Sequence, residues 1–169
     1  KQKMKNLPMY LTGAAKFFQS ECQSYVMASN TAHMFHTEMN ILARNKLTNL
    51  LDQAVITQFK PGDRVLVLGT KKAYDANLYP NALKRREITP VPVSEEDAGA
   101  IQRFIDATKE HRNPNPEDLK VFLEKYPHSH VLLGCTELPL ALHGDLLLEE
   151  TTTANTEALF AEFIAKKLQ

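Results

Sequence analysis

The chain has 169 residues, of which 43% are hydrophobic and 24% are charged, and its formal net charge at pH 7 is zero. A chain of this size buries one compact core or two small lobes. No run approaches the roughly 20 apolar residues that span a bilayer, so we expect no membrane partner. The balanced charge argues against nucleic acid as a partner. Two cysteines do not make a disulfide framework, so we expect a cytoplasmic protein.

The first half of the chain alternates between helix-like and strand-like patterns. We expect, in chain order, residues 9–20 (helix), 23–28 (strand), 32–44 (helix), 47–56 (a short strand running into a helix) and 64–68 (strand). The composition of Lys60-Pro61-Gly62-Asp63 predicts a turn before the last of these strands.

The second half continues the alternation. We expect residues 75–86 (helix), 88–93 (an edge strand, because it holds two prolines), 94–110 (a helix capped by its serine), 116–125 (helix), 130–133 (strand) and 156–168 (helix). Strands that alternate with helices predict an α/β fold with mostly parallel sheets and flanking helices.

Two of the predicted strands end in small polar residues. Ala28-Ser29-Asn30-Thr31-Ala32-His33 follows the first strand, and Leu133-Gly134-Cys135-Thr136-Glu137-Leu138-Pro139 follows the strand at 130–133. Ligands of open α/β sheets bind outside the carboxyl ends of the strands. The two segments are therefore the candidate active site.

Cys135 is the candidate nucleophile or base. It stands at a predicted strand-to-helix turn, where a helix N-terminus lowers the pKa of a thiol below about 8.5. Thr136 and Glu137 add a hydroxyl, a carboxylate and unpaired helix N–H groups that suit an anion. The alternative is that Cys135 is only a small buried side chain at a strand end.

Ser29, Asn30, Thr31 and His33 form the second candidate cluster. The hydroxyls and the amide suit a carboxylate, and His33 can donate a hydrogen bond or a proton. The alternative is an ordinary helix N-cap. Thr70, at the end of the strand over 64–68, is a weaker candidate of the same kind.

The sequence predicts neither a metal site nor a cofactor site. His128 and His130 would lie on one face of a strand, but no third ligand has a diagnostic spacing. The chain also lacks a glycine-rich phosphate loop and a dinucleotide-binding fingerprint.

The two candidate segments resemble the motifs of the aspartate/glutamate racemase family. The residues that carry the resemblance are Ser29-Asn30-Thr31-Ala32-His33 and Gly134-Cys135-Thr136-Glu137-Leu138-Pro139-Leu140. Leu68-Gly69-Thr70, followed by Tyr79 and Leu83, is loosely similar to the middle motif of that family. The resemblance spans the chain from Tyr10 to the C-terminal helix, which is nearly its whole length.

The resemblance implies a two-lobed α/β isomerase with its active site between the lobes. It implies a cofactor-independent proton transfer at the α-carbon of aspartate or glutamate. It also implies that the protein is a homodimer and that its ligand is a small amino acid or dicarboxylate. By position, Cys135 is one base, Asn30 and Thr31 bind a carboxylate, and Thr136 orients the substrate. Thr70, Glu137 and His33 are the further substrate contacts. We expect an N-terminal-type lobe at residues 1–52 and 150–169 and a second lobe at 53–149.

The chain departs from the family pattern in three places. Ser29 stands where a second catalytic cysteine is usual, and a hydroxyl is a far weaker acid, so Ser29 would act as a relay, through His33. Ala73 stands where threonine is more common, and we expect the N-terminal lobe to lack its first β-α-β stretch. Two alternatives stay open: a decarboxylase-type relative that uses one thiol, and an inactive carboxylate-binding protein.

Overall fold

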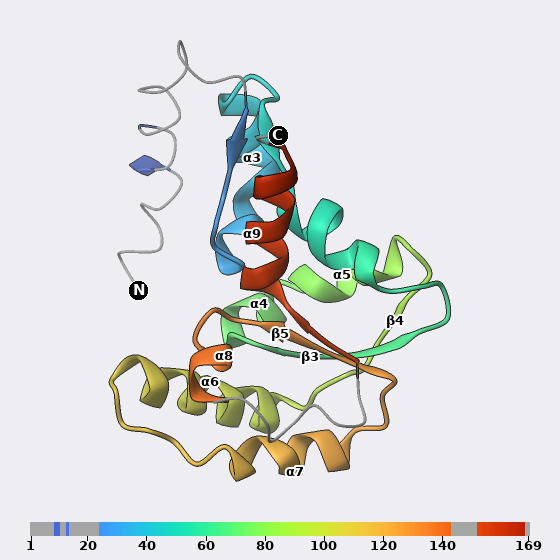
Figure 1. Cartoon of the computed structure of the whole chain (residues 1–169), viewed down its shortest axis with the longest axis vertical. Coiled ribbons are helices and arrows are strands. Elements are labelled where there is room, and N and C mark those ends of the chain that lie inside the picture. The colour runs from blue at the N-terminus through green and yellow to red at the C-terminus, as the bar shows by residue number, and fades with distance from the viewer. Residues whose placement is uncertain (1–8, 11–12, 14–23, 143–151, 168–169) are drawn as a thin grey trace.

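The computed structural model describes residues 9–10, 13, 24–142 and 152–167, and the predicted helix over 9–20 lies almost wholly outside them (Figure 1). The described strands form two parallel sheets. The smaller sheet pairs β1 (Tyr25–Val26) with β2 (Leu47–Thr48), and the larger has the order β4-β3-β5-β6. With helices against both faces of the larger sheet, this is the α/β class that the sequence predicts.

The other elements follow in chain order. They are η1 (Thr31–Phe35), α3 (His36–Leu42), η2 (Leu51–Val55), η3 (Ile56–Gln58), β3 (Arg64–Gly69), α4 (Lys71–Asp75), α5 (Leu78–Lys84), β4 (Thr89–Pro90), α6 (Glu95–Lys109), α7 (Glu117–Lys125), β5 (His130–Gly134), α8 (Leu138–Ala141), β6 (Thr152–Asn155) and α9 (Thr156–Lys167).

Strand β3 is buried on both faces, which explains its continuous apolar run. Val65 and Val67 point to one face of the sheet, where they pack in a core with side chains of η2, α5 and α9. Leu66 and Leu68 point to the other face and pack against α6 and α7. Figure 1 shows α5 and α9 on one side of the sheet and α6 and α7 on the other.

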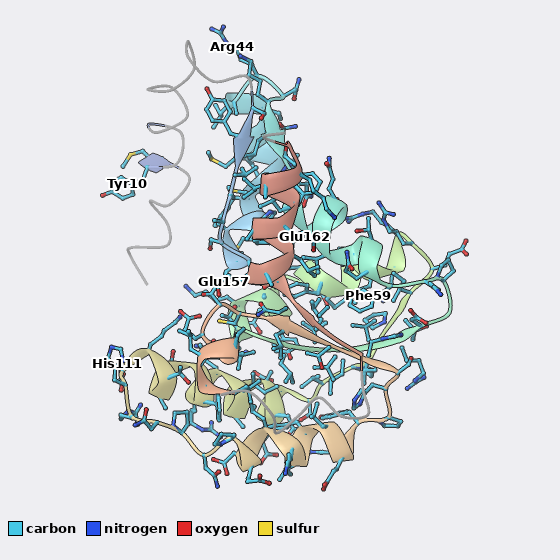
Figure 2. All side chains as sticks on the ribbon, in the orientation of Figure 1. Tyr10, Arg44, Phe59, His111, Glu157 and Glu162 are labelled. Carbon is cyan, nitrogen blue, oxygen red and sulfur yellow. The ribbon has the colours of Figure 1, made fainter. Side chains whose placement is uncertain are left out.

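Two local predictions are confirmed, although the edge strand is shorter than the predicted 88–93. Strand β4 is an edge strand, and Pro90 pairs with Val65 at the border of the sheet. Helix α6 begins after Ser94, whose Oγ accepts a hydrogen bond from the Asp97 N–H at 3.1 Å. Figure 2 shows His111 just beyond the far end of this helix.

Three elements differ from the predictions. The helix over 75–86 is α5 alone, because Asn77 takes a left-handed conformation with φ 49° and separates α5 from the unpredicted helix α4. Strand β6 was not predicted, because its sequence, TTAN, holds no apolar run. The predicted helix over 32–44 is divided between η1 and α3.

Helix α9 connects the two sheets. It leaves β6 in the larger sheet and packs against η2, which follows the smaller sheet. Figure 2 shows Glu157 at the start of α9 and Glu162 further along it. The division into lobes at residues 53 and 150 stays a prediction. Within the described ranges, no helix combines the length and apolar character that a membrane crossing needs.

Candidate active site

The chain segments that follow β1, β3 and β5 meet at one pocket of about 180 Å³. Strands β3 and β5 are parallel, and Gly69 is the partner of Gly134, so Thr70 and Cys135 emerge at the same edge of the sheet. The pocket is lined by Ala28, Ser29, Asn30, Thr31, Thr70, Lys109, Gly134, Cys135, Thr136 and Glu137. All of the predicted site residues except His33 therefore line this pocket.

Cys135 is buried, and its thiol donates a hydrogen bond to Glu137 Oε2 at 2.8 Å. The Thr136 hydroxyl donates to the same oxygen at 3.0 Å. Burial, and then the carboxylate of Glu137, raise the pKa of Cys135 to about 12. The predicted lowering of this pKa is therefore wrong. Helix α8 begins only at Leu138 and has four residues, so its dipole does little to stabilise a thiolate. The hydrogen-bond partner of the thiol is an anion, which further disfavours a thiolate.

Lys109 is a site residue that the sequence analysis missed. It is the last residue of α6, and its Nζ lies 3.4 Å from Glu137 Oε1. Burial acts to raise the pKa of Glu137, but the hydrogen bond from Cys135 and the charge of Lys109 outweigh it, so the pKa is lowered. A lysine in the last turn of a helix is common, so only the fold singles it out.

Thr156 is a second residue that sequence analysis missed, and it holds Asn30 in the pocket. Its fully buried hydroxyl accepts a hydrogen bond from Asn30 Nδ2 at 2.7 Å and donates one to the Leu133 carbonyl at 3.0 Å. The Asn30 Oδ1 atom is buried and has no partner among the described residues. A second link joins the segments, because the hydroxyls of Thr31 and Thr70 are 3.0 Å apart.

His33 is buried and does not line the pocket. Its ring is 4% exposed, and Nδ1 is 2.9 Å from the carbonyl oxygen of Ser29. The hydrogen bond between the two residues thus uses the Ser29 carbonyl, not the hydroxyl through which a relay was expected. Burial, above all, lowers the pKa of His33, so the ring is neutral near pH 7. Ser29 itself is exposed.

Among the described residues, no group of three or more His, Cys, Asp and Glu side chains is arranged to hold a metal ion. Of the two histidines that the sequence analysis weighed as a metal pair, only His130 lies on β5, and its Nε2 is 3.2 Å from Asp63 Oδ2. This contact links the start of β5 to the turn before β3.

Three solved structures share the fold at low sequence identity. An aspartate racemase homologue from Pyrococcus horikoshii has a TM-score of 0.74 and 21% identity, over 100% of this chain and 77% of that one. A Yersinia pestis protein provisionally named an Asp/Glu racemase has a TM-score of 0.79 and 19% identity over the same shares. Glutamate racemase from Francisella tularensis, in complex with D-glutamate, has a TM-score of 0.69 and 13% identity over 99% of this chain and 65% of that one.

A search of curated protein sequences gave no match. A family model does match: the Asp/Glu/Hydantoin racemase model covers residues 3–158, which include every residue that lines the pocket. The chain belongs to the Asp/Glu/Hydantoin racemase family.

Proposed function

We propose that the protein is a cofactor-independent isomerase that moves the α-proton of aspartate or glutamate. One observation carries the proposal: a buried thiol, a lysine and a set of hydroxyls line a single small pocket. The membership of the racemase family and the fold shared with aspartate and glutamate racemases support it.

The pocket suits an amino acid with two carboxylates. Lys109 supplies the positive charge for one carboxylate. The hydroxyls of Thr31 and Thr70 share one hydrogen bond, so one O–H of the pair stays free to donate to the other carboxylate. The Asn30 amide is oriented by Thr156, which leaves Oδ1 as a buried acceptor. That oxygen suits the substrate ammonium group better than the carboxylate that the family resemblance implies for Asn30.

Proton transfer starts from a neutral thiol. The thiol first loses its proton to water, and the thiolate, a minor form because the pKa of Cys135 is about 12, takes the α-proton. Return of a proton from the same thiol regenerates the starting enantiomer. Inversion requires a donor on the other face, and we assign this role to the Ser29 hydroxyl, which regains a proton from water because it is exposed. A hydroxyl is a weak acid, so we expect exchange to be faster than inversion.

The test is NMR in D₂O with L- and D-aspartate and L- and D-glutamate supplied separately. Wild type is compared with Cys135→Ala, and Cys22→Ala is the matched control for loss of a thiol. Loss of the α-proton signal that requires Cys135 supports proton transfer, and appearance of the other enantiomer identifies a racemase.

The remaining outcomes separate the alternatives. Exchange with retention means that Cys135 works without Ser29. Binding without exchange in a folded sample contradicts the proposal and favours a carboxylate-binding protein, and release of carbon dioxide from an arylmalonate favours the decarboxylase-type reaction. The proposed homodimer is tested by sedimentation of the wild type, and the proposed cytoplasmic location by cell fractionation.

A further inference from the structure

A second pocket of about 290 Å³ is separate from the catalytic one. Its lining comes from η1, α3, the segment around η2, and α5. The polar residues that matter most are His33, His36, Asn49, Asp52, Asn81 and Arg85. None of them lines the catalytic pocket.

The hydrogen bonds of His33 determine which of its ring nitrogens is free. The Ser29 carbonyl oxygen can only accept, so Nδ1 carries the proton and donates at 2.9 Å. Because burial lowers the pKa of His33, the ring is neutral and Nε2 is a bare acceptor. The Nε2 atom is buried and has no partner among the described residues. A buried acceptor without a donor is unfavourable, so a ligand that donates a hydrogen bond here would be stabilised.

The charges in this pocket balance. Arg85 Nη2 lies 2.7 Å from Asp52 Oδ1, and Asn49 donates to the other oxygen of Asp52 at 2.9 Å. The carboxylate is therefore satisfied, whereas the guanidinium has five N–H donors and this pair uses one. A simple anion is attracted only weakly, because the charge of Arg85 is already neutralised by Asp52. A simple cation is repelled by Arg85. The lining favours a ligand with zero net charge that carries both a donor and an acceptor.

A metal ion fits the pocket poorly. The rings of His33 and His36 are parallel within 3°, and their centroids are 6.3 Å apart. His36 Nε2 is 3.1 Å from the Leu47 carbonyl oxygen, so this nitrogen donates its proton and is not available as a ligand. The described residues also contain no third group for a metal centre.

We propose that this pocket is a second binding site for a free amino acid, bound as its zwitterion. The ammonium group donates to His33 Nε2, and the carboxylate accepts from Arg85 and from the side-chain amide of Asn81. His33 also donates to the carbonyl of Ser29, which lines the catalytic pocket, so this ring links the proposed site to a residue of the catalytic one.

The test follows the ring nitrogens of His33 by ¹H–¹⁵N correlation in protein labelled at histidine. The probe is L-serine. Lactate, which lacks the ammonium group, and ethanolamine, which lacks the carboxylate, serve as its two halves. We expect L-serine to move the bare Nε2 resonance toward the position of a hydrogen-bonded nitrogen, and each half to bind at least about tenfold more weakly.

Arg85→Gln provides the variant, and Arg112→Gln its matched control. Both arginines are more than half exposed, and each lies 2.7 Å from one carboxylate, that of Asp52 or Glu110, so neither change threatens the fold. We expect Arg85→Gln to weaken L-serine binding about tenfold or more, and Arg112→Gln to leave it unchanged.

Three results overturn the proposal. In one, the Nε2 resonance does not respond to L-serine. In another, observed in a second sample labelled uniformly with ¹⁵N, the response is confined to the amides of Cys135 and Thr136, which places serine in the catalytic pocket. In the third, lactate or ethanolamine binds as well as L-serine, which removes the need for a zwitterion. None of these readouts depends on racemase activity, so they are independent of the proposed function.

Discussion

Asn30 and Thr156 are 126 positions apart in the chain, and their side chains form a buried hydrogen bond of 2.7 Å. The Thr156 hydroxyl in turn donates a hydrogen bond to the Leu133 carbonyl at the end of β5. One hydroxyl thus connects the segment after β1 with the strand that leads to Cys135. Because Thr156 donates to a carbonyl, it must accept from Asn30, and this fixes which end of the Asn30 amide is free.

Replacing Thr156 by valine removes this connection without changing the volume of the side chain much. Asn30 Nδ2 and the Leu133 carbonyl then stay buried without their partner, so we expect Thr156→Val to lower the free energy of unfolding by about 1–3 kcal/mol. Urea denaturation measures the change. Thr156→Ser keeps the hydroxyl and should recover most of the loss, and equal stability of the valine and wild-type proteins would show that this bond contributes nothing.

The sequence was sufficient for the parts of the site that depend on local pattern. The apolar run of β3 and the small polar residues after β5 predict a strand end at Thr70 and another at Cys135, and β3 and β5 do pair in parallel. Lys109 and Thr156 could not be found in this way, because each reaches the site only through contacts between distant segments. The shift of the Cys135 pKa was predicted in the wrong direction, because the sequence does not reveal that the carboxylate of Glu137 accepts a hydrogen bond from the thiol.

The high pKa of Cys135 predicts low reactivity toward alkylating agents. With a pKa of about 12, only about one thiol in 10⁴ is ionised at pH 8, and the thiolate is the form that reacts. Glu137→Gln removes the anion that accepts the hydrogen bond of the thiol, whereas burial stays, so we expect the pKa of Cys135 to fall part of the way. The rate of alkylation by iodoacetamide at pH 9 should rise several-fold.

This measurement is made in a Cys22→Ala background, which leaves a single thiol. Glu110→Gln is the control, because Glu110 is exposed and pairs with Arg112 instead. If Glu137→Gln reacts no faster than Glu110→Gln, the carboxylate does not hold the thiol in its neutral form.

Gly134 is packed so closely against Tyr79 that it leaves no room for a side chain. A Cβ at this position would lie 2.7 Å from Cζ and from the hydroxyl oxygen of Tyr79, whose hydroxyl donates to the Gly134 carbonyl at 2.8 Å. We expect Gly134→Ala to cost about 1–3 kcal/mol of stability, measured by thermal or urea unfolding. At Gly69 a Cβ would meet Tyr79 at 3.5 Å, an ordinary contact, so Gly69→Ala is the matched control. Similar losses in the two variants would contradict this account.

Asp97 makes the fold sensitive to acid. Hydrogen bonds from Lys125, Tyr126 and Ser94 lower its pKa from 3.8 to about 2. A carboxyl whose pKa is lower in the folded state contributes stability above its unfolded pKa, and that contribution is lost as the pH falls from about 4 to about 2. We expect Asp97→Asn to flatten the decline of stability over this range. Asp118→Asn, on the exposed side of α7, should follow the wild type, and the same decline in both variants would exclude Asp97 as the cause.

Ser29 separates proton exchange from inversion in the proposed reaction. A thiol has a pKa near 8.5 and is a much stronger acid than a hydroxyl, so Ser29→Cys supplies a better donor at the exposed side of the pocket. We expect this variant to raise the rate of inversion about tenfold or more, measured by chiral chromatography, relative to exchange measured by NMR. Ser29→Ala should abolish inversion and leave exchange with retention through Cys135. If a folded Ser29→Cys protein shows no gain while Ser29→Ala keeps its inversion, the second proton comes from another group, and Ser29 is not the partner of Cys135.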